Sequence, residues 1–104
     1  MAKFVMIVQS DPLDGQEDVY NAWYDGTHIP ELLQIPGITG GRRLEATPNV
    51  IGTPGAKYVT MYEIEADNPG AVMAEMGKRG ADGRLSPSVG VDSSKATIWI
   101  YADK

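Results

Sequence analysis

The sequence predicts an α+β fold of the ferredoxin-like kind, in which two helices cover one face of a four-stranded antiparallel sheet. Four short segments rich in β-branched and aromatic residues alternate with two helical segments in the order β-α-β-β-α-β. The 104 residues contain ordinary globular proportions of apolar (42%) and charged (22%) side chains. No linker divides them, so we expect a single domain over residues 1–104.

The first half of the chain predicts a strand followed by an interrupted helix. Lys3–Gln9 is a short apolar segment typical of a strand. Asp14 and Glu17 have the spacing of a capping box, which predicts a helix over residues 16–26. Because Pro30 cannot continue that helix without a break, a second short helical piece is expected to begin there.

The second half predicts two strands, a helix and a last strand. Residues 56–66 form the clearest strand of the chain. Asn68 and Pro69 mark the start of a short helix. Residues 77–95 are rich in Gly, Ser and Pro, which predicts a long loop, either a lid or a flexible segment. The remaining elements are strands over residues 38–46 and 96–102 and a turn over residues 47–55.

Both faces of the predicted sheet are apolar. In the first strand, Val5 and Ile7 point away from the face that Met6 occupies, and in the last strand Trp99 and Tyr101 alternate with isoleucines. Two short helices can cover only one face. We therefore expect a homodimer in which the second face meets a copy of itself. The alternative is that strand twist and edge effects leave these side chains partly exposed.

Composition excludes several classes of function. The formal net charge is −5 and no basic stripe is present, so no nucleic-acid partner is expected. The chain has no cysteine and one histidine, which excludes disulfides, thiolate nucleophiles and a histidine cage within one subunit. The glycines at 37, 40 and 41 follow a helix, so they do not form a phosphate loop, and no metal or cofactor is expected. The longest apolar run, residues 4–8, is too short to span a membrane, which favours a cytoplasmic protein without a membrane partner.

The candidate chemistry centres on His28, the single histidine. Histidine titrates close to working pH, which makes it a suited general acid or base. Trp23, Tyr24 and Asp25 precede it, so aromatic walls and a carboxylate are expected nearby. The alternative is a capping or hydrogen-bonded histidine that fixes the break before Pro30.

Each neighbour of His28 has two interpretations. Asp25 could orient the imidazole on a continuing helix, or it could be a solvated acid at the helix end. Trp23 lies on a stripe with Val19, so it either belongs to the core or forms a wall of a substrate site. Tyr24 lies beside that stripe and could present its hydroxyl to a ligand as a catalytic group.

The strands supply further candidates for substrate binding. Tyr58 and Tyr62 share one face of the third strand, and Trp99 lies on the last strand. Each could contact a ligand or an interface between subunits. Arg42 and Arg43 point to opposite faces, so one could bind a carboxylate or enolate while the other faces solvent; Arg42 is the candidate for binding.

Residues 20–43 resemble the helix-to-strand signature of EthD-like proteins of the dimeric α/β-barrel superfamily. The matching positions are Trp23-Tyr24, His28-Ile29-Pro30, Leu32-Leu33, Ile35-Pro36-Gly37 and Arg42-Arg43. The resemblance implies two ferredoxin-like subunits whose sheets face each other, with a ligand cleft between the helices and the sheet of each subunit. In several superfamily members a histidine near the end of the first helix, or in the cleft, moves a proton, and His28 matches that position.

These observations lead to three hypotheses. The leading one is a cofactor-free isomerase, cyclase, dehydratase or lyase that uses His28 as general acid or base on an aromatic, polyketide-like or lactone substrate. The second is a cofactor-independent quinol or anthrone monooxygenase, which needs the same base. The third is a non-catalytic dimer that binds a hydrophobic metabolite.

Overall fold

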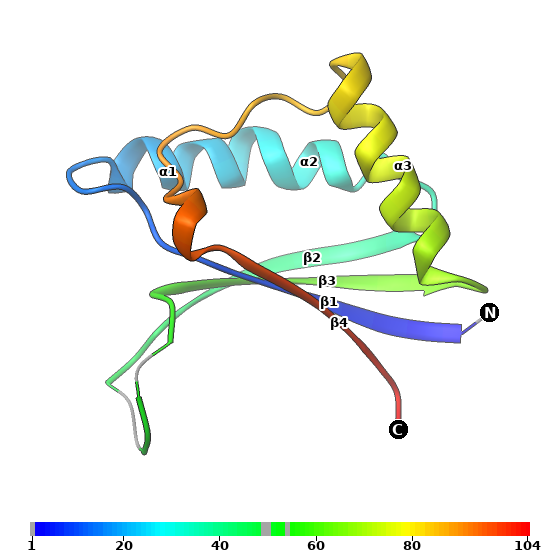
Figure 1. Cartoon of the computed structure of the whole chain (residues 1–104), viewed down its shortest axis with the longest axis horizontal. Helices are drawn as coiled ribbons and strands as arrows, with labels where there is room; N and C mark the ends of the chain where they lie inside the picture. The colour runs from blue at the N-terminus through cyan, green and yellow to red at the C-terminus, as the bar shows by residue number, and fades with distance from the viewer. Residues whose placement is uncertain (1, 49–50, 54) are drawn as a thin grey trace.

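The protein folds into two layers, with helices on one face of a four-stranded sheet (Figure 1). A computed structural model describes residues 2–48, 51–53 and 55–104. The strand order is β2-β3-β1-β4 and every pairing is antiparallel, so the predicted ferredoxin-like α+β fold is confirmed. In chain order the elements are β1 (Ala2–Ser10), α1 (Glu17–Trp23), the π-helical segment η1 (Tyr24–His28), α2 (Ile29–Leu32), β2 (Ile38–Glu45), β3 (Tyr58–Ala66), α3 (Pro69–Asp82), the short 3-10 helix η2 (Ser93–Lys95) and β4 (Thr97–Ala102).

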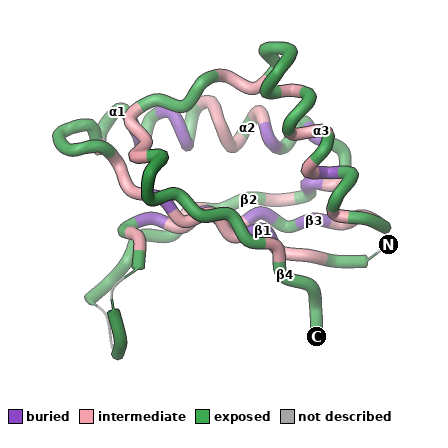
Figure 2. Tube along the Cα trace, in the orientation of Figure 1, coloured by how far each residue is buried: buried purple, intermediate pink, exposed green. Residues whose placement is uncertain are grey.

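The register of the strands decides which side chains face the helices. Met6 and Gly41 both pair with Tyr62, from opposite sides, so these three positions share the helix-facing side of the sheet. Ile7 pairs with Trp99, and both point to the other side, which we call the outer face. Figure 2 shows that the buried positions lie between the two layers, whereas β4 is exposed or intermediate along its whole length.

The core between the layers has an aliphatic and an aromatic part. The aliphatic part brings α2 and α3 onto the sheet through Met6, Leu32, Ile35, Ile38, Ile64 and Val72, and the Tyr62 ring packs with them. The aromatic part lies under α1 and η1 and consists of Tyr20, Trp23, Tyr24 and Tyr58. The phenol groups of Tyr20, Tyr24 and Tyr58 therefore lie at one end of the helix–sheet interface.

The predicted break before Pro30 is wrong, because one helical segment runs from Glu17 to Leu32. In an α-helix the Pro30 ring would collide with the carbonyl of Gly26. Here the backbone widens instead into a π-helical turn, in which the N–H of Ile29 donates to the carbonyl oxygen of Tyr24, five residues earlier. The proline is thus accommodated without ending the helix.

The predicted capping box at the start of α1 is also wrong. The helix begins at Glu17, its N-cap is Gln16, and no side chain caps it. The Glu17 carboxylate accepts hydrogen bonds from Lys57 and Tyr58 instead. Glu17 consequently ties the helix to β3 and is not used at the helix terminus.

Helix α3 is longer than the glycines in its sequence predict. α3 continues through Gly77 and ends where Gly83 adopts a φ of 87°, so the following loop is shorter than expected. That loop is anchored, since both the backbone N–H and the hydroxyl of Ser86 donate to Glu31. The helix start is as predicted, with Asn68 capping the N–H of Gly70. The predicted turn over residues 47–55 lies partly outside the described residues.

Candidate functional site

Six aromatic rings and one arginine gather between the sheet and the first helical segment, and we call this group the aromatic site. The ring centroids of Tyr20 lie 4.9 Å from Tyr24 and 5.3 Å from Tyr58, distances at which aromatic pairs attract each other. Its members are Tyr20, Trp23, Tyr24 and His28 from α1 and η1, Arg43 from β2, and Tyr58 and Tyr62 from β3.

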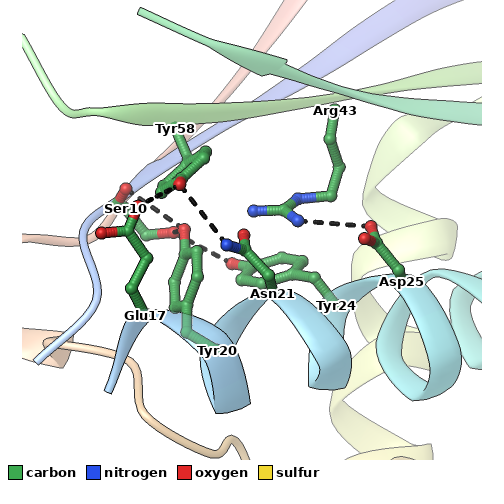
Figure 3. Close-up of polar contacts among 8 residues, drawn as sticks. All are labelled: Ser10, Glu17, Tyr20, Asn21, Tyr24, Asp25, Arg43 and Tyr58. Carbon is green, nitrogen blue, oxygen red and sulfur yellow. Dashed lines mark hydrogen bonds and ion pairs between the residues drawn. The ribbon is translucent and has the colours of Figure 1, made fainter. Parts of the chain in front are cut away.

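A buried hydroxyl network closes one end of the aromatic site (Figure 3). The Ser10 Oγ atom lies 2.6 Å from the hydroxyl oxygen of Tyr20 and 3.1 Å from that of Tyr24. The Tyr20 hydroxyl also donates to the backbone carbonyl oxygen of Ser10 at 3.2 Å. The Tyr24 hydroxyl, a predicted catalytic group, therefore already has a partner within the protein.

The π-helical turn places His28 against Trp23. The two residues are five positions apart, and their rings stack with centroids 4.4 Å apart and an interplanar angle of 19°. Tyr24 meets the imidazole edge-on at 5.4 Å. Burial lowers the pKa of His28, and the nearby Glu31 carboxylate offsets this only in part. The imidazole is consequently neutral near neutral pH, and its buried Nδ1 atom has no hydrogen-bond partner.

Tyr62 contributes a second unpartnered polar group. Its side chain is fully buried, its hydroxyl has no hydrogen-bond partner, and burial strongly raises the pKa of the phenol. The ring fits over β2 because Gly41 has no side chain: a Cβ atom there would lie 3.0 Å from Cδ1 of Tyr62. The phenol therefore stays protonated and can donate a hydrogen bond. The indole Nε1 atom of Trp23 is buried without a partner as well.

Of the two adjacent arginines, Arg43 is the one that enters the aromatic site. Its guanidinium carbon lies 4.9 Å from the ring centroids of Tyr24 and Tyr58 and 5.3 Å from that of Tyr20. Arg42, the predicted binding residue, is exposed on the outer face. Side chains alternate along β2, so the sequence predicts that the two arginines point to opposite faces. The register decides which one faces the helices: Arg43 pairs with Thr60, which lies between Tyr58 and Tyr62 on β3.

Asp25 does not orient the imidazole of His28. Its carboxylate accepts a hydrogen bond from Nη1 of Arg43 at 3.2 Å, and its side chain is 66% exposed (Figure 3). The acid whose charge acts on His28 is Glu31, one helical turn later.

Asn21 was missed by the sequence reasoning. Its Nδ2 atom lies 3.4 Å from the Tyr58 hydroxyl, and its buried Oδ1 atom has no partner.

An open pocket of about 370 Å³ adjoins the aromatic site. Its lining residues are Asn21, Asp25, Arg43, Leu44, Glu45 and Tyr58. A separate hollow of about 250 Å³ lies on the outer face, beside Arg42 and Met61. Trp99 also lies on the outer face, so the structure does not bring Arg42 and Trp99 together with His28.

The side chains of the aromatic site offer one imidazole, four phenols and one guanidinium. Over the described ranges, no group of three or more His, Asp or Glu residues is arranged to hold a metal ion. Within the same residues, no helix combines the length and apolar character needed to cross a bilayer.

Comparison with known proteins identifies the fold. The sequence matches no protein-family model and no curated protein. The structure is similar to the crystal structure of an ethyl tert-butyl ether D (EthD) family protein from Bacillus halodurans C-125, with a TM-score of 0.68 and 15% sequence identity. The similarity covers 100% of both chains. Together with the two-layer topology described above, this shows that the chain has the EthD-like fold.

Proposed function

We propose that this protein is a small enzyme that moves a proton on a hydrophobic substrate held in the aromatic site, with His28 as the general acid or base. One observation carries the proposal: the imidazole of His28, packed against the rings of Trp23 and Tyr24, has a buried Nδ1 atom without a hydrogen-bond partner, and the buried phenol of Tyr62 is unpartnered as well. Buried polar groups are nearly always hydrogen-bonded, so unpartnered ones that share an aromatic site favour a role in binding and chemistry. The substrate class is an aromatic, polyketide-like or lactone compound with a carbonyl group.

The mechanism requires only side chains of the chain itself. The Nδ1 atom of His28 takes a proton from the carbon next to the substrate carbonyl. The Tyr62 hydroxyl donates a hydrogen bond to the carbonyl oxygen, where negative charge collects as the enolate forms. The imidazolium then returns the proton, to another carbon in an isomerisation or to a leaving hydroxyl in a dehydration. The surrounding rings of Trp23 and Tyr24 exclude water and so strengthen these interactions.

The working form in this proposal is a homodimer. The outer face carries Trp99, 62% exposed, together with Tyr101 and Leu44, which are exposed as well. A second copy that packs its own outer face onto this surface would remove these side chains from water. The aromatic site lies on the other face of the sheet, so it stays open to substrate in such a dimer.

Proton exchange at carbon tests the proposal without knowledge of the full reaction. Aromatic ketones and lactones are incubated with the protein in D₂O, and deuterium at the carbon next to the carbonyl is measured by mass spectrometry. We expect exchange to be catalysed by the wild type and to fall at least about 100-fold in His28→Gln, with ligand affinity retained. Exchange that is unaffected by His28→Gln would contradict the proposal.

Two tyrosine variants separate the role of Tyr62 from general packing. Tyr62→Phe is expected to lower exchange about tenfold or more, while leaving the free energy of unfolding unchanged or about 1 kcal/mol higher, because an unpartnered buried hydroxyl is removed. The matched control is Tyr101→Phe on the outer face, which should alter neither quantity. If the wild type catalyses no exchange and the variants only lose affinity for the ligand, the protein is a binding protein. If the wild type consumes oxygen together with the substrate, it is a monooxygenase.

A further inference from the structure

Arg43 is a buried charge that the protein compensates only in part. Its side chain is 13% exposed, and among the described residues its one carboxylate partner is Asp25, through a single contact of 3.2 Å. The faces of Tyr20, Tyr24 and Tyr58 supply attraction to the cation. A single contact to an exposed carboxylate is a weak ion pair, so the desolvation of the guanidinium is not fully offset.

The unpartnered atoms of Arg43 form one complete edge of the guanidinium. Nη1 faces Asp25, whereas Nε and Nη2 are both buried and lack a hydrogen-bond partner. The Nε–Nη2 edge presents two parallel N–H groups, the arrangement that binds both oxygens of a carboxylate. The part of Arg43 best suited to a planar anion is therefore the part that the protein leaves unused.

The surroundings of this edge suit a small aromatic acid. The pocket of about 370 Å³ adjoins Arg43, and the ring of Tyr58 and the side chain of Leu44 line it as well. Two acids, Asp25 and Glu45, line the pocket and disfavour a loosely held anion. A carboxylate binds favourably only if it reaches the Nε–Nη2 edge itself, where the tyrosine rings around Arg43 can stack against the ligand.

We propose that Arg43 binds a carboxylate group of the small molecule held in the aromatic site, so that the ligand class is a planar aromatic or conjugated acid. The proposal rests on the proposed function in one respect, that the aromatic site takes a small molecule. In this arrangement Asp25 stays on Nη1, and the carboxylate of the ligand pairs with the N–H groups of Nε and Nη2. The two carboxylates then share one guanidinium, so the charge of Asp25 opposes binding of the ligand. Because Nε and Nη2 are covered in the ligand-free protein, the ligand displaces the side chains that cover them.

Three probes of one shape and different charge test this assignment. Benzoate, benzamide and benzamidine are titrated into the full-length protein, and binding is followed by calorimetry and by the ¹H–¹⁵N resonance of the Arg43 Nε–H group. We expect benzoate to bind about 10- to 100-fold more tightly than benzamide and to shift the Arg43 resonance. The difference in affinity between benzoate and benzamidine should be larger still. Equal affinities for the three, or a preference for benzamidine, would overturn the proposal.

Variants locate the effect on one side chain. Arg43→Met should remove the preference for benzoate, and Arg43→Lys, which keeps the charge but loses the two-pronged edge, should remove most of it. Arg42→Met changes the net charge identically on the outer face and should leave benzoate affinity unchanged. Asp25→Asn should tighten benzoate several-fold, because the negative charge that opposes the carboxylate of the ligand is removed. A loss in Arg42→Met equal to that in Arg43→Met would refute the assignment, and so would weaker binding in Asp25→Asn.

These readouts are independent of catalysis. Failure of the benzoate preference would leave the His28-dependent exchange reaction standing. Conversely, a benzoate preference that depends on Arg43, combined with no exchange in the wild type, would keep the acid site and remove the enzyme hypothesis.

Discussion

His28 is the only histidine of the chain, so its titration can be followed without ambiguity. Burial lowers its pKa in the folded protein below the ordinary value of 6.5. Between the two pKa values the unfolded chain binds more protons than the folded one, so protonation favours unfolding. We expect the free energy of unfolding of the wild type to fall, relative to that of His28→Gln, as the pH drops through about 6.5, and to stop falling below the folded-state pKa.

Denaturant titrations of both proteins at about pH 8 and about pH 5 measure this difference. The carboxylates whose pKa values are lowered, such as Glu17 and Glu31, titrate in both proteins, so their contribution largely cancels in the comparison. An NMR titration of the imidazole gives the folded-state pKa directly. If the two proteins lose the same stability in acid, His28 does not have the buried neutral environment described here.

At the residue scale, the sequence predicts which residues lie together better than which polar contacts they make. His28, Trp23 and Tyr24 were expected to lie together, and they do. The spacing of three residues predicts Asp25 as a possible partner of the His28 imidazole, but its carboxylate lies against Arg43. Sequence spacing does not contain the cross-strand register that brings an arginine from β2 under η1.

At the scale of elements, the helix with Pro30 shows where local rules stop. The proline rule correctly indicates that a regular α-helix cannot run uninterrupted through Pro30. It cannot say whether the chain breaks or widens. That choice depends on packing, because Tyr20 and Trp23 before the π-helical turn and Leu32 after it are all buried at the interface with the sheet. A π-helical turn keeps both groups in place, which a broken helix would not.

β2 provides a matched pair of glycines for a test at the same scale. A Cβ atom at Gly41 would lie 3.0 Å from Cδ1 and 3.2 Å from Cε1 of the buried Tyr62 ring, whereas at Gly40 its nearest neighbour would be the flexible carboxylate end of Glu63. We expect Gly41→Ala to lower the free energy of unfolding by about 1–3 kcal/mol, because the ring cannot move away. Gly40→Ala should change it by less than about 0.5 kcal/mol. Thermal and denaturant unfolding of the two variants decide this, and equal effects would contradict the close approach.

For the whole molecule, the succession of strand-like and helix-like segments predicts the order of the elements. Apolar residues at successive strand positions predict that both faces of the sheet are apolar, and the structure places Ile7 and Trp99 on the outer face as expected. The sequence pattern of one chain does not identify what contacts the outer face. The helices of the described residues all lie on the other side of the sheet (Figure 1), so none of these helices covers the outer face.

The proposed homodimer yields a test of the outer face. Trp99→Lys places a charge on the surface that would be shared by two copies, so burial of that surface becomes unfavourable. We expect the wild type to sediment as a dimer at micromolar concentration and Trp99→Lys to sediment as a folded monomer. Val19→Lys, at an exposed apolar position in the helix layer, makes the same chemical change away from the outer face and should remain a dimer. A wild type that sediments as a monomer, or a Val19→Lys variant that dissociates as readily as Trp99→Lys, would show that the outer face is not the contact between subunits.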